Sequence, residues 1–141
     1  MIVTDANKNT LKEIREREKK EKENRIKALC ETIASERCGG IEKLVAFSNK
    51  HKGLWYLPAL TDDEQVEKLL VLKPIDRNIL SFASTKISDD GLYAFLEAAM
   101  RECVITEISD MVMLEDDEYF ISAANSFNKI MEGKKTLLVK R

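Results

Sequence analysis

The side chains best suited to catalysis are one histidine, His51, and three cysteines, Cys30, Cys38 and Cys103. A thiol beside an imidazole can act as a nucleophile with its general base, and Cys103 with His51 is the one conceivable pair. Neither residue stands in a stretch that resembles a nucleophile motif, and His51 lies between two lysines and close to a glycine. The sequence therefore predicts a polar loop residue at His51, a small core residue at Cys103, and no enzymatic activity.

Three acidic clusters, Asp62–Asp63, Asp89–Asp90 and Asp116–Asp117, have the chemistry of metal ligands. None has the alternating oxygen ligands and glycine of a calcium loop, and no second histidine completes a transition-metal site. Turn formation and helix capping explain each cluster. The pair Gly39-Gly40 lacks the following Lys-Ser or Lys-Thr of a phosphate-binding loop. We therefore expect neither a metal site nor a cofactor.

Charge is distributed unevenly along the 141 residues, although the net charge is only −2. Residues 1–37 hold ten Lys and Arg against eight Asp and Glu, residues 87–132 hold two against eleven, and residues 134–141 add four basic groups. Because there is no overall basic field to hold a polyanion, nucleic acid is a poor candidate partner. The absence of a long apolar run and of an apolar signal core, together with free thiols, predicts a soluble, cytoplasmic protein.

A long charged helix is predicted from Thr10 to about Arg37, because this stretch has neither Pro nor Gly and Thr10 and Glu13 have the spacing of a capping box. Its middle, Arg15 to Arg25, contains no apolar residue. Pairs in which an acid precedes a base by four residues, each contributing roughly 0.2–0.5 kcal/mol, are expected to stabilise it. These pairs are Glu13/Arg17, Glu16/Lys20, Glu18/Lys22, Glu21/Arg25 and Glu23/Lys27.

After the charged stretch, Ile26, Leu29, Cys30 and Ile33 form a one-sided apolar stripe that should pack onto another element. Gly39 or Gly40 can then end the helix in a left-handed conformation, which suggests a hinge. We predict a charged helical arm over residues 1–38 and a compact helical domain with a β-hairpin over residues 39–141.

The predicted fold class is α+β and mostly α, with three or four amphipathic helices and a small hairpin. The expected elements are a helix over 41–50, strands over 54–57 and 66–73 around a turn at 61–64, and helices from after Pro74 to Lys86, from Ser88 or Asp89 to Cys103, and from Asp116 to Met131 or Gly133. Pro58 should end its strand or lie at an edge. Residues 104–108 could form a strand or a loop, and residues 134–141, with Thr136 to Val139, a strand or a continued helix.

Two groups of residues are candidate contacts for a partner protein. Trp55 and Tyr56 lie in a predicted edge strand, where side chains alternate in direction, so one of the two should face outward. Leu11 and Ile14 form an apolar island before the charged stretch, and its simplest use is to grip another chain. Whether two arms pair with each other, as in a coiled coil, stays open.

From about Ile41 onward, a strand pair leads into Val71-Leu72-Lys73-Pro74-Ile75-Asp76-Arg77, and an alanine-bearing helix passes through Ala83. A second helix ends near Cys103, Glu115-Asp116-Asp117-Glu118-Tyr119-Phe120 opens a third, and a Lys-rich end closes the chain. This order resembles the tail assembly chaperone-like small proteins of tailed bacteriophages. The resemblance implies a non-enzymatic protein that binds a long helical tape-measure protein and keeps it soluble. A rod-like arm would equally suit a structural subunit or adaptor of a virion, which remains the alternative.

Overall fold

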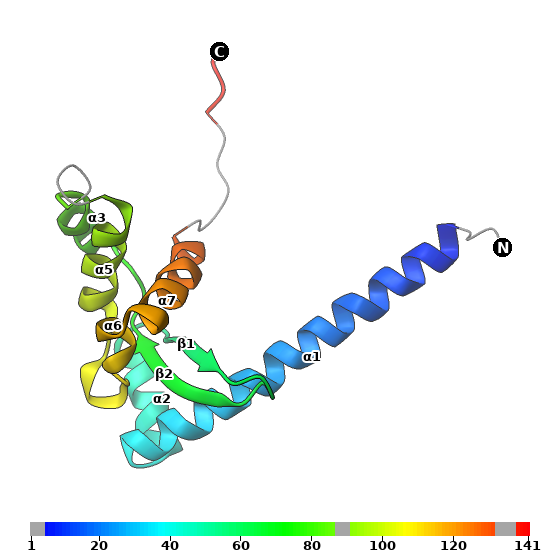
Figure 1. The fold of residues 1–141 in the computed structure, drawn as a ribbon, viewed down its shortest axis with the longest axis horizontal. Helices are drawn as coiled ribbons and strands as arrows, with labels where there is room; N and C mark the ends of the chain where they lie inside the picture. The colour runs from blue at the N-terminus through cyan, green and yellow to red at the C-terminus, as the bar shows by residue number, and fades with distance from the viewer. Residues whose placement is uncertain (1–4, 87–90, 132–137) are drawn as a thin grey trace.

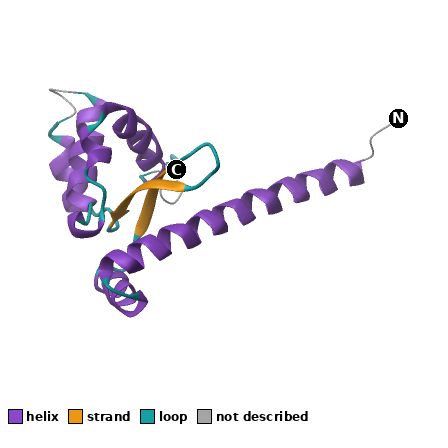
Figure 2. Ribbon diagram, turned by 60° about the horizontal axis from the view of Figure 1, so that its bottom comes forward, coloured by secondary structure: helices purple, strands orange, loops and turns teal. Residues whose placement is uncertain are grey.

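The structure is a computed structural model that describes residues 5–86, 91–131 and 138–141, with side chains from residue 10 onward. Its elements are α1 (Asp5–Cys38), α2 (Ile41–Lys50), β1 (Trp55–Leu60), β2 (Val66–Leu72), α3 (Arg77–Ser84), α5 (Leu92–Cys103), a 3-10 turn (Thr106–Ile108), α6 (Val112–Glu115) and α7 (Asp117–Ile130). Helices dominate and the strands form one antiparallel pair, which confirms the predicted fold class (Figures 1 and 2).

The long N-terminal helix α1 spans 34 residues and begins at Asp5, so the predicted start at a Thr10 capping box is wrong. No Pro or Gly separates Asp5 from Thr10, and the helix continues through both. It ends where predicted, because Gly39 and Gly40 have φ values of 91° and 137°, which side-chain-bearing residues rarely adopt.

The five ion pairs expected within α1 are not formed among its described side chains. Instead, Lys22 and Arg25 each approach Glu64 of the hairpin turn at 3.2 Å. Exposed pairs along a helix contribute little free energy, so a tertiary carboxylate competes with them easily. The middle of α1 is therefore tied to the hairpin through Glu64.

The β-hairpin pairs β1 with β2 in a register that places Leu57 opposite Leu70 and Pro58 opposite Leu69. Pro58 does not end the strand, which continues to Leu60 after a register shift at Ala59. A proline cannot donate a ladder hydrogen bond, and its place on β1, the edge strand of this pair, meets that restriction.

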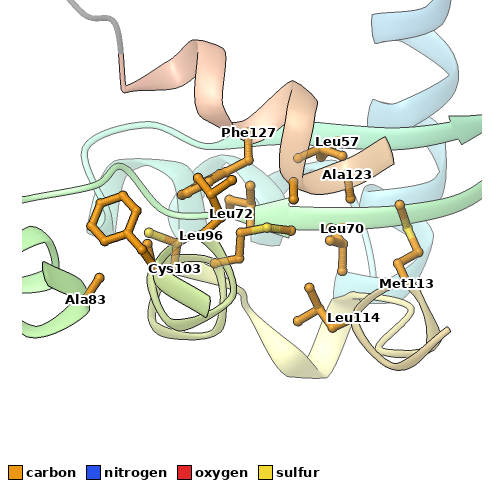
Figure 3. Close-up of a cluster of buried hydrophobic side chains, with 14 of the residues drawn as sticks. Leu57, Leu70, Leu72, Ala83, Leu96, Cys103, Met113, Leu114, Ala123 and Phe127 are labelled. Atoms are coloured by element: carbon orange, nitrogen blue, oxygen red, sulfur yellow. The ribbon is translucent and has the colours of Figure 1, made fainter. Parts of the chain in front are cut away.

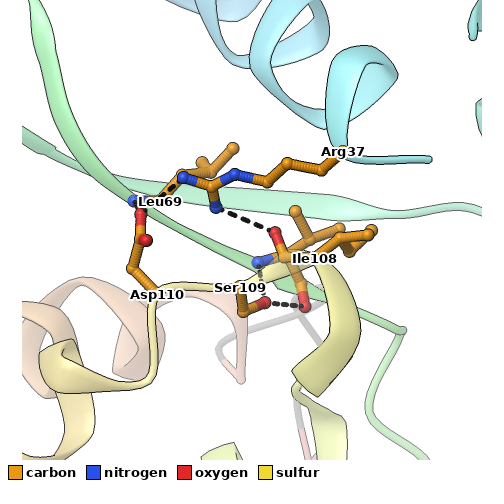
Figure 4. A network of polar contacts seen from close by, with 6 residues as sticks. Arg37, Leu69, Ile108, Ser109 and Asp110 are labelled. Carbon is orange, nitrogen blue, oxygen red and sulfur yellow. Dashed lines mark hydrogen bonds and ion pairs between the residues drawn. The ribbon is translucent and has the colours of Figure 1, made fainter. Parts of the chain in front are cut away.

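Residues 103–110 cover the edge of β2 that does not pair with β1. Residues 104–108, for which a strand or a loop was expected, form an isolated bridge at Val104 followed by the 3-10 turn. The side chains of Ser109 and Asp110 accept hydrogen bonds from the backbone N–H groups of Val71 and Leu69, both at 2.9 Å (Figure 4). These acceptors satisfy donors that an uncovered strand would leave without a partner.

Arg37 connects the end of α1 to the segment that covers the edge of β2. Its guanidinium donates to the Ile108 carbonyl oxygen at 3.0 Å and to Asp110 Oδ2 at 2.8 Å (Figure 4). Burial raises the pKa of the Asp110 carboxyl, but the hydrogen bonds from Arg37 and Leu69 outweigh that effect, and the pKa lies below its ordinary value. Asp110 is thus a charged acceptor shared by α1 and β2.

Successive side chains of β2 enter two different hydrophobic clusters, as the alternation of a strand requires. The first core cluster joins Leu70 and Leu72 to α3, α5, α6 and α7 (Figure 3). The second core cluster joins Leu69 and Val71 to α1 and α2. The hairpin therefore lies between two helical layers (Figure 1).

The last turns of α1 belong to the second core cluster, because Cys30 and Ala34 are buried there. Of the predicted apolar stripe, Cys30 is buried in this cluster and Ile26 and Ile33 pack against it. The division into an arm of residues 1–38 and a domain of residues 39–141 stays a prediction.

Helix ends follow local capping, with two differences from the predictions. Asp76 caps α3 by accepting from the Ile79 N–H, so this helix begins two residues later than expected after Pro74. Gly91 is the N-cap of α5, while Ser88 and Asp89 lie outside the described residues. Asp116 caps α7 as predicted.

The C-terminal end is only partly described. Helix α7 ends at Ile130, and Gly133 and Thr136 lie outside the described residues. Residues 138–141 form neither a helix nor a strand, and Leu138 is fully exposed. Both predicted alternatives are therefore wrong for these last four residues.

Candidate functional site

The described residues form an apolar groove of about 680 Å³ between α1, α2 and the start of β1. It is lined by Glu23, Ile26, Lys27, Cys30 and Glu31 of α1, by Ile41, Leu44, Val45, Ser48 and Asn49 of α2, and by Gly53, Leu54, Trp55, Tyr56 and Pro58. Charged residues occur only on the α1 side of this lining, and the other walls are apolar or neutral. We call this depression the groove.

Helix α2 forms one wall because the two glycines after α1 turn the chain back against it. Leu44 is buried in the second core cluster, whereas Ile41 and Val45 are 55% and 51% exposed. An amphipathic helix ordinarily turns its large apolar residues toward the core. The exposed pair instead leaves an unpartnered apolar surface on the groove.

Trp55 and Tyr56 both line the groove but differ in how far they are exposed to solvent. Trp55 is 49% exposed, while Tyr56 packs against the second core cluster. Burial, with the nearby Glu31 carboxylate, raises the pKa of Tyr56 to about 12. The prediction that one of the two faces outward is confirmed, and their role in binding stays a prediction.

Leu11 and Ile14 do not join the groove on their own chain. They are 52% and 42% exposed on the part of α1 that extends away from the other elements (Figures 1 and 2). Ile14 precedes Glu23, the first lining residue of α1, by nine residues, or about 14 Å along the helix axis. The four predicted contacts are thus two separate surfaces.

Ile41 and Val45 are groove residues that the sequence did not single out as candidate contacts. Their spacing of four residues, with Leu44 between, is that of an ordinary amphipathic face. Nothing in this local pattern separates the two exposed residues from the buried Leu44. Only the neighbouring elements determine which of them becomes covered.

Cys103 and His51 do not form a nucleophile and base. Cys103 is fully buried in the first core cluster, and burial raises the pKa of its thiol to about 11. His51 packs its ring on Phe47, with centroids 5.7 Å apart, and Phe47 lies against the second core cluster. The two side chains therefore belong to opposite faces of the hairpin.

We expect the three thiols to differ sharply in reactivity. Burial raises the pKa of Cys30 and Cys103 to about 11, whereas Cys38 is partly exposed and its pKa is raised by its partial burial. In the folded protein at neutral pH, maleimide should label Cys38 slowly and the other two only after denaturation. Mass spectrometry of labelled peptides checks this, and rapid labelling at Cys103 would contradict the described core.

No group of three or more His, Cys, Asp or Glu side chains in the described residues is arranged to hold a metal ion. Within the same residues, no helix has both the length and the hydropathy that crossing a membrane requires. The groove is a surface on which several large apolar side chains, Ile41, Val45 and Trp55, are exposed around one depression. Comparison with protein-family models, with curated proteins and with solved structures finds no match to this chain.

Proposed function

We propose that this chain is a non-enzymatic protein-binding factor whose groove takes the apolar face of a helical segment from another protein. The resemblance of residues 41–141 to phage tail assembly chaperones supplies the setting: assembly of a phage tail in the host cytoplasm, with a tape-measure protein as partner. Holding such a segment would keep a long apolar helix soluble until the tail tube forms around it.

The observation that carries the proposal is the exposure of Ile41, Val45 and Trp55 around one depression. Grooves of this kind bind amphipathic helices through apolar residues at positions i, i+3 or i+4, and i+7. Tryptophan often anchors such interfaces because it contributes a large apolar surface and a hydrogen-bond donor. Charged Glu23, Lys27 and Glu31 along α1 would orient the polar side of the bound helix.

Trp55 is the one tryptophan of the chain, so its fluorescence reports on the groove directly. We expect a synthetic amphipathic helix with leucines at i, i+4 and i+7 to shift this emission to shorter wavelength in a saturable titration. A peptide of the same composition with the leucines scattered should not do so. Equal effects of both peptides would contradict a groove that selects an apolar helical face.

Replacing Val45 by serine should weaken binding of the leucine-striped peptide about tenfold, because burying a valine side chain contributes on the order of 1.5 kcal/mol. Leu92→Ser is the matched control, since Leu92 is similarly exposed but lies on α5, outside the groove. Fluorescence titration of both variants gives the comparison. Similar losses in the two would place binding elsewhere.

A structural subunit or adaptor of a virion is the second candidate, favoured by the part of α1 that projects from the other elements (Figure 1). Such a subunit would be found in purified particles at a fixed copy number. A chaperone would be absent from them and would raise the soluble yield of a co-expressed tape-measure protein.

A further inference from the structure

Six charged residues of α1 lie on one face of the helix and alternate in sign. They are Lys12, Glu16, Lys20, Glu23, Lys27 and Glu31. Neighbours in this series are three or four residues apart, so they fall within a sector of about 100° around the helix. We call this set the charge stripe.

The charge stripe runs from the groove onto the projecting part of α1. Its last three members, Glu23, Lys27 and Glu31, line the groove, and its first three continue the same face toward the N-terminus. None of the six forms an ion pair in the described part of the protein, whose ion pairs join other residues. The face is therefore open to a second chain.

An alternating stripe of this kind is complementary to itself when two helices run antiparallel. If Glu16 of one copy lies opposite Lys27 of the other, Lys12 then lies opposite Glu31 and Lys20 opposite Glu23. The two-fold axis repeats these three pairs, so all six charges meet an opposite charge. In a parallel, in-register pair each would meet its own sign, which disfavours that arrangement.

The same register brings the apolar island of the arm to the groove. Ile14 comes level with Leu29 of the second copy, beside the groove-lining part of α1. Leu11 and Ile14 lie about 150° around the helix from the charge stripe. A helix in the groove with its stripe against α1 thus turns these two residues to the far wall, where Ile41, Val45 and Trp55 are exposed.

We propose that the free protein is an antiparallel, two-fold dimer in which each α1 lies in the groove of the other copy. This inference rests on the groove being the docking site of the proposed function, and it adds a regulation: a helical partner must displace the arm. Exposed ion pairs contribute little, so the apolar contacts supply affinity and the charges fix direction. Because each α1 binds the other copy, the contact area is formed twice. A stable dimer needs a total buried area of roughly 1,200 Å².

The dimer also explains why a wholly exposed helical stretch is present. From Thr10 to Arg25 every residue is exposed, and the part after Ile14 has no apolar side chain. A helix without an apolar stripe is marginal in isolation, even at the length of this stretch. Pairing with a second α1 adds tertiary contacts to the two that Lys22 and Arg25 make with Glu64.

The test is the molar mass in sedimentation equilibrium at low ionic strength. We expect twice the monomer mass of 16.1 kDa, with a dissociation constant that rises as salt screens the stripe. Lys12→Glu/Glu16→Lys/Lys20→Glu reverses the first half of the stripe, and Glu23→Lys/Lys27→Glu/Glu31→Lys reverses the second half. Each variant alone places like charges opposite each other and should be monomeric.

Mixing the two variants makes every pair opposite in sign again, so the mixture should recover the twofold mass. Arg17→Glu/Glu21→Lys is the matched control, because it exchanges two charges of α1 outside the stripe and should remain dimeric. Circular dichroism establishes that each variant keeps its helices. A monomeric wild-type chain at low salt, or reversed variants that stay monomeric when mixed, would overturn the dimer.

Failure of this inference and failure of the proposed function give different results. A monomeric chain that still binds the leucine-striped peptide removes the dimer and keeps the groove as a helix site. A dimer of the described charge dependence that does not bind the peptide keeps the dimer and removes the proposed function. When both hold, adding the peptide should convert the dimer to monomers.

Discussion

Replacing Phe127 by alanine is expected to lower the free energy of unfolding by about 3–5 kcal/mol, the range for a fully buried phenylalanine. Phe127 is 1% exposed and is among the largest fully buried side chains of the described residues. It extends from α7 into the first core cluster, to which Leu57, Leu72 and Leu96 also belong (Figure 3). Its removal leaves a cavity that this rigid packing cannot fill.

Urea denaturation followed by circular dichroism measures the effect. Ile121→Ala is the matched control, because Ile121 belongs to the same helix but is half exposed. It should change the free energy of unfolding by no more than about 0.5 kcal/mol. Equal losses in the two variants would mean that α7 packs on the hairpin through a different face.

Replacing Asp110 by alanine should lower the free energy of unfolding by about 1–3 kcal/mol, the cost of leaving a part-buried polar group without its partner. The substitution removes the acceptor for both the Leu69 N–H and the Arg37 guanidinium. Loss of the contact with Arg37 also frees the end of α1 from the covered edge of β2. Chemical denaturation of the wild type and the variant at neutral pH gives the difference.

The contribution of Asp110 should depend on pH in a defined direction. The folded state holds the pKa of this carboxyl below its ordinary value, so its stabilisation is present above the unfolded pKa of about 3.9. It is lost as the pH falls through the lower, folded pKa. Between about pH 5 and pH 2, the free energy of unfolding should therefore fall less in Asp110→Ala than in the wild type. This interval includes both the unfolded and the lowered, folded pKa of Asp110.

Asp110→Asn separates charge from hydrogen bonding, because its amide oxygen can still accept from Leu69. It should lose the acid-dependent component while keeping more stability at neutral pH than Asp110→Ala. An unchanged pH profile in both variants would show that the carboxylate does not interact with Arg37 in the folded state.

Local patterns in the sequence determined most of the secondary structure. The positive φ values at Gly39 and Gly40, the cap at Asp116, and the apolar and aromatic run at residues 54–57 each act within a few residues. A capping residue satisfies the N–H groups of its own first turn, so its effect can be recognised without the rest of the chain. The prediction that the helix starts at Thr10 was wrong because it also used only local sequence. The capping pattern at Thr10 lies inside a helix that begins at Asp5.

The sequence by itself also determined that the protein has a long charged helix. Only the tertiary structure decided that Val45 stays exposed while Leu44 is buried, and that Trp55 borders a groove. It also joined Arg37 to Asp110, 73 residues away in the chain. Periodicity identifies the apolar face of an element but not what covers that face, because covering depends on elements that the chain brings together only on folding.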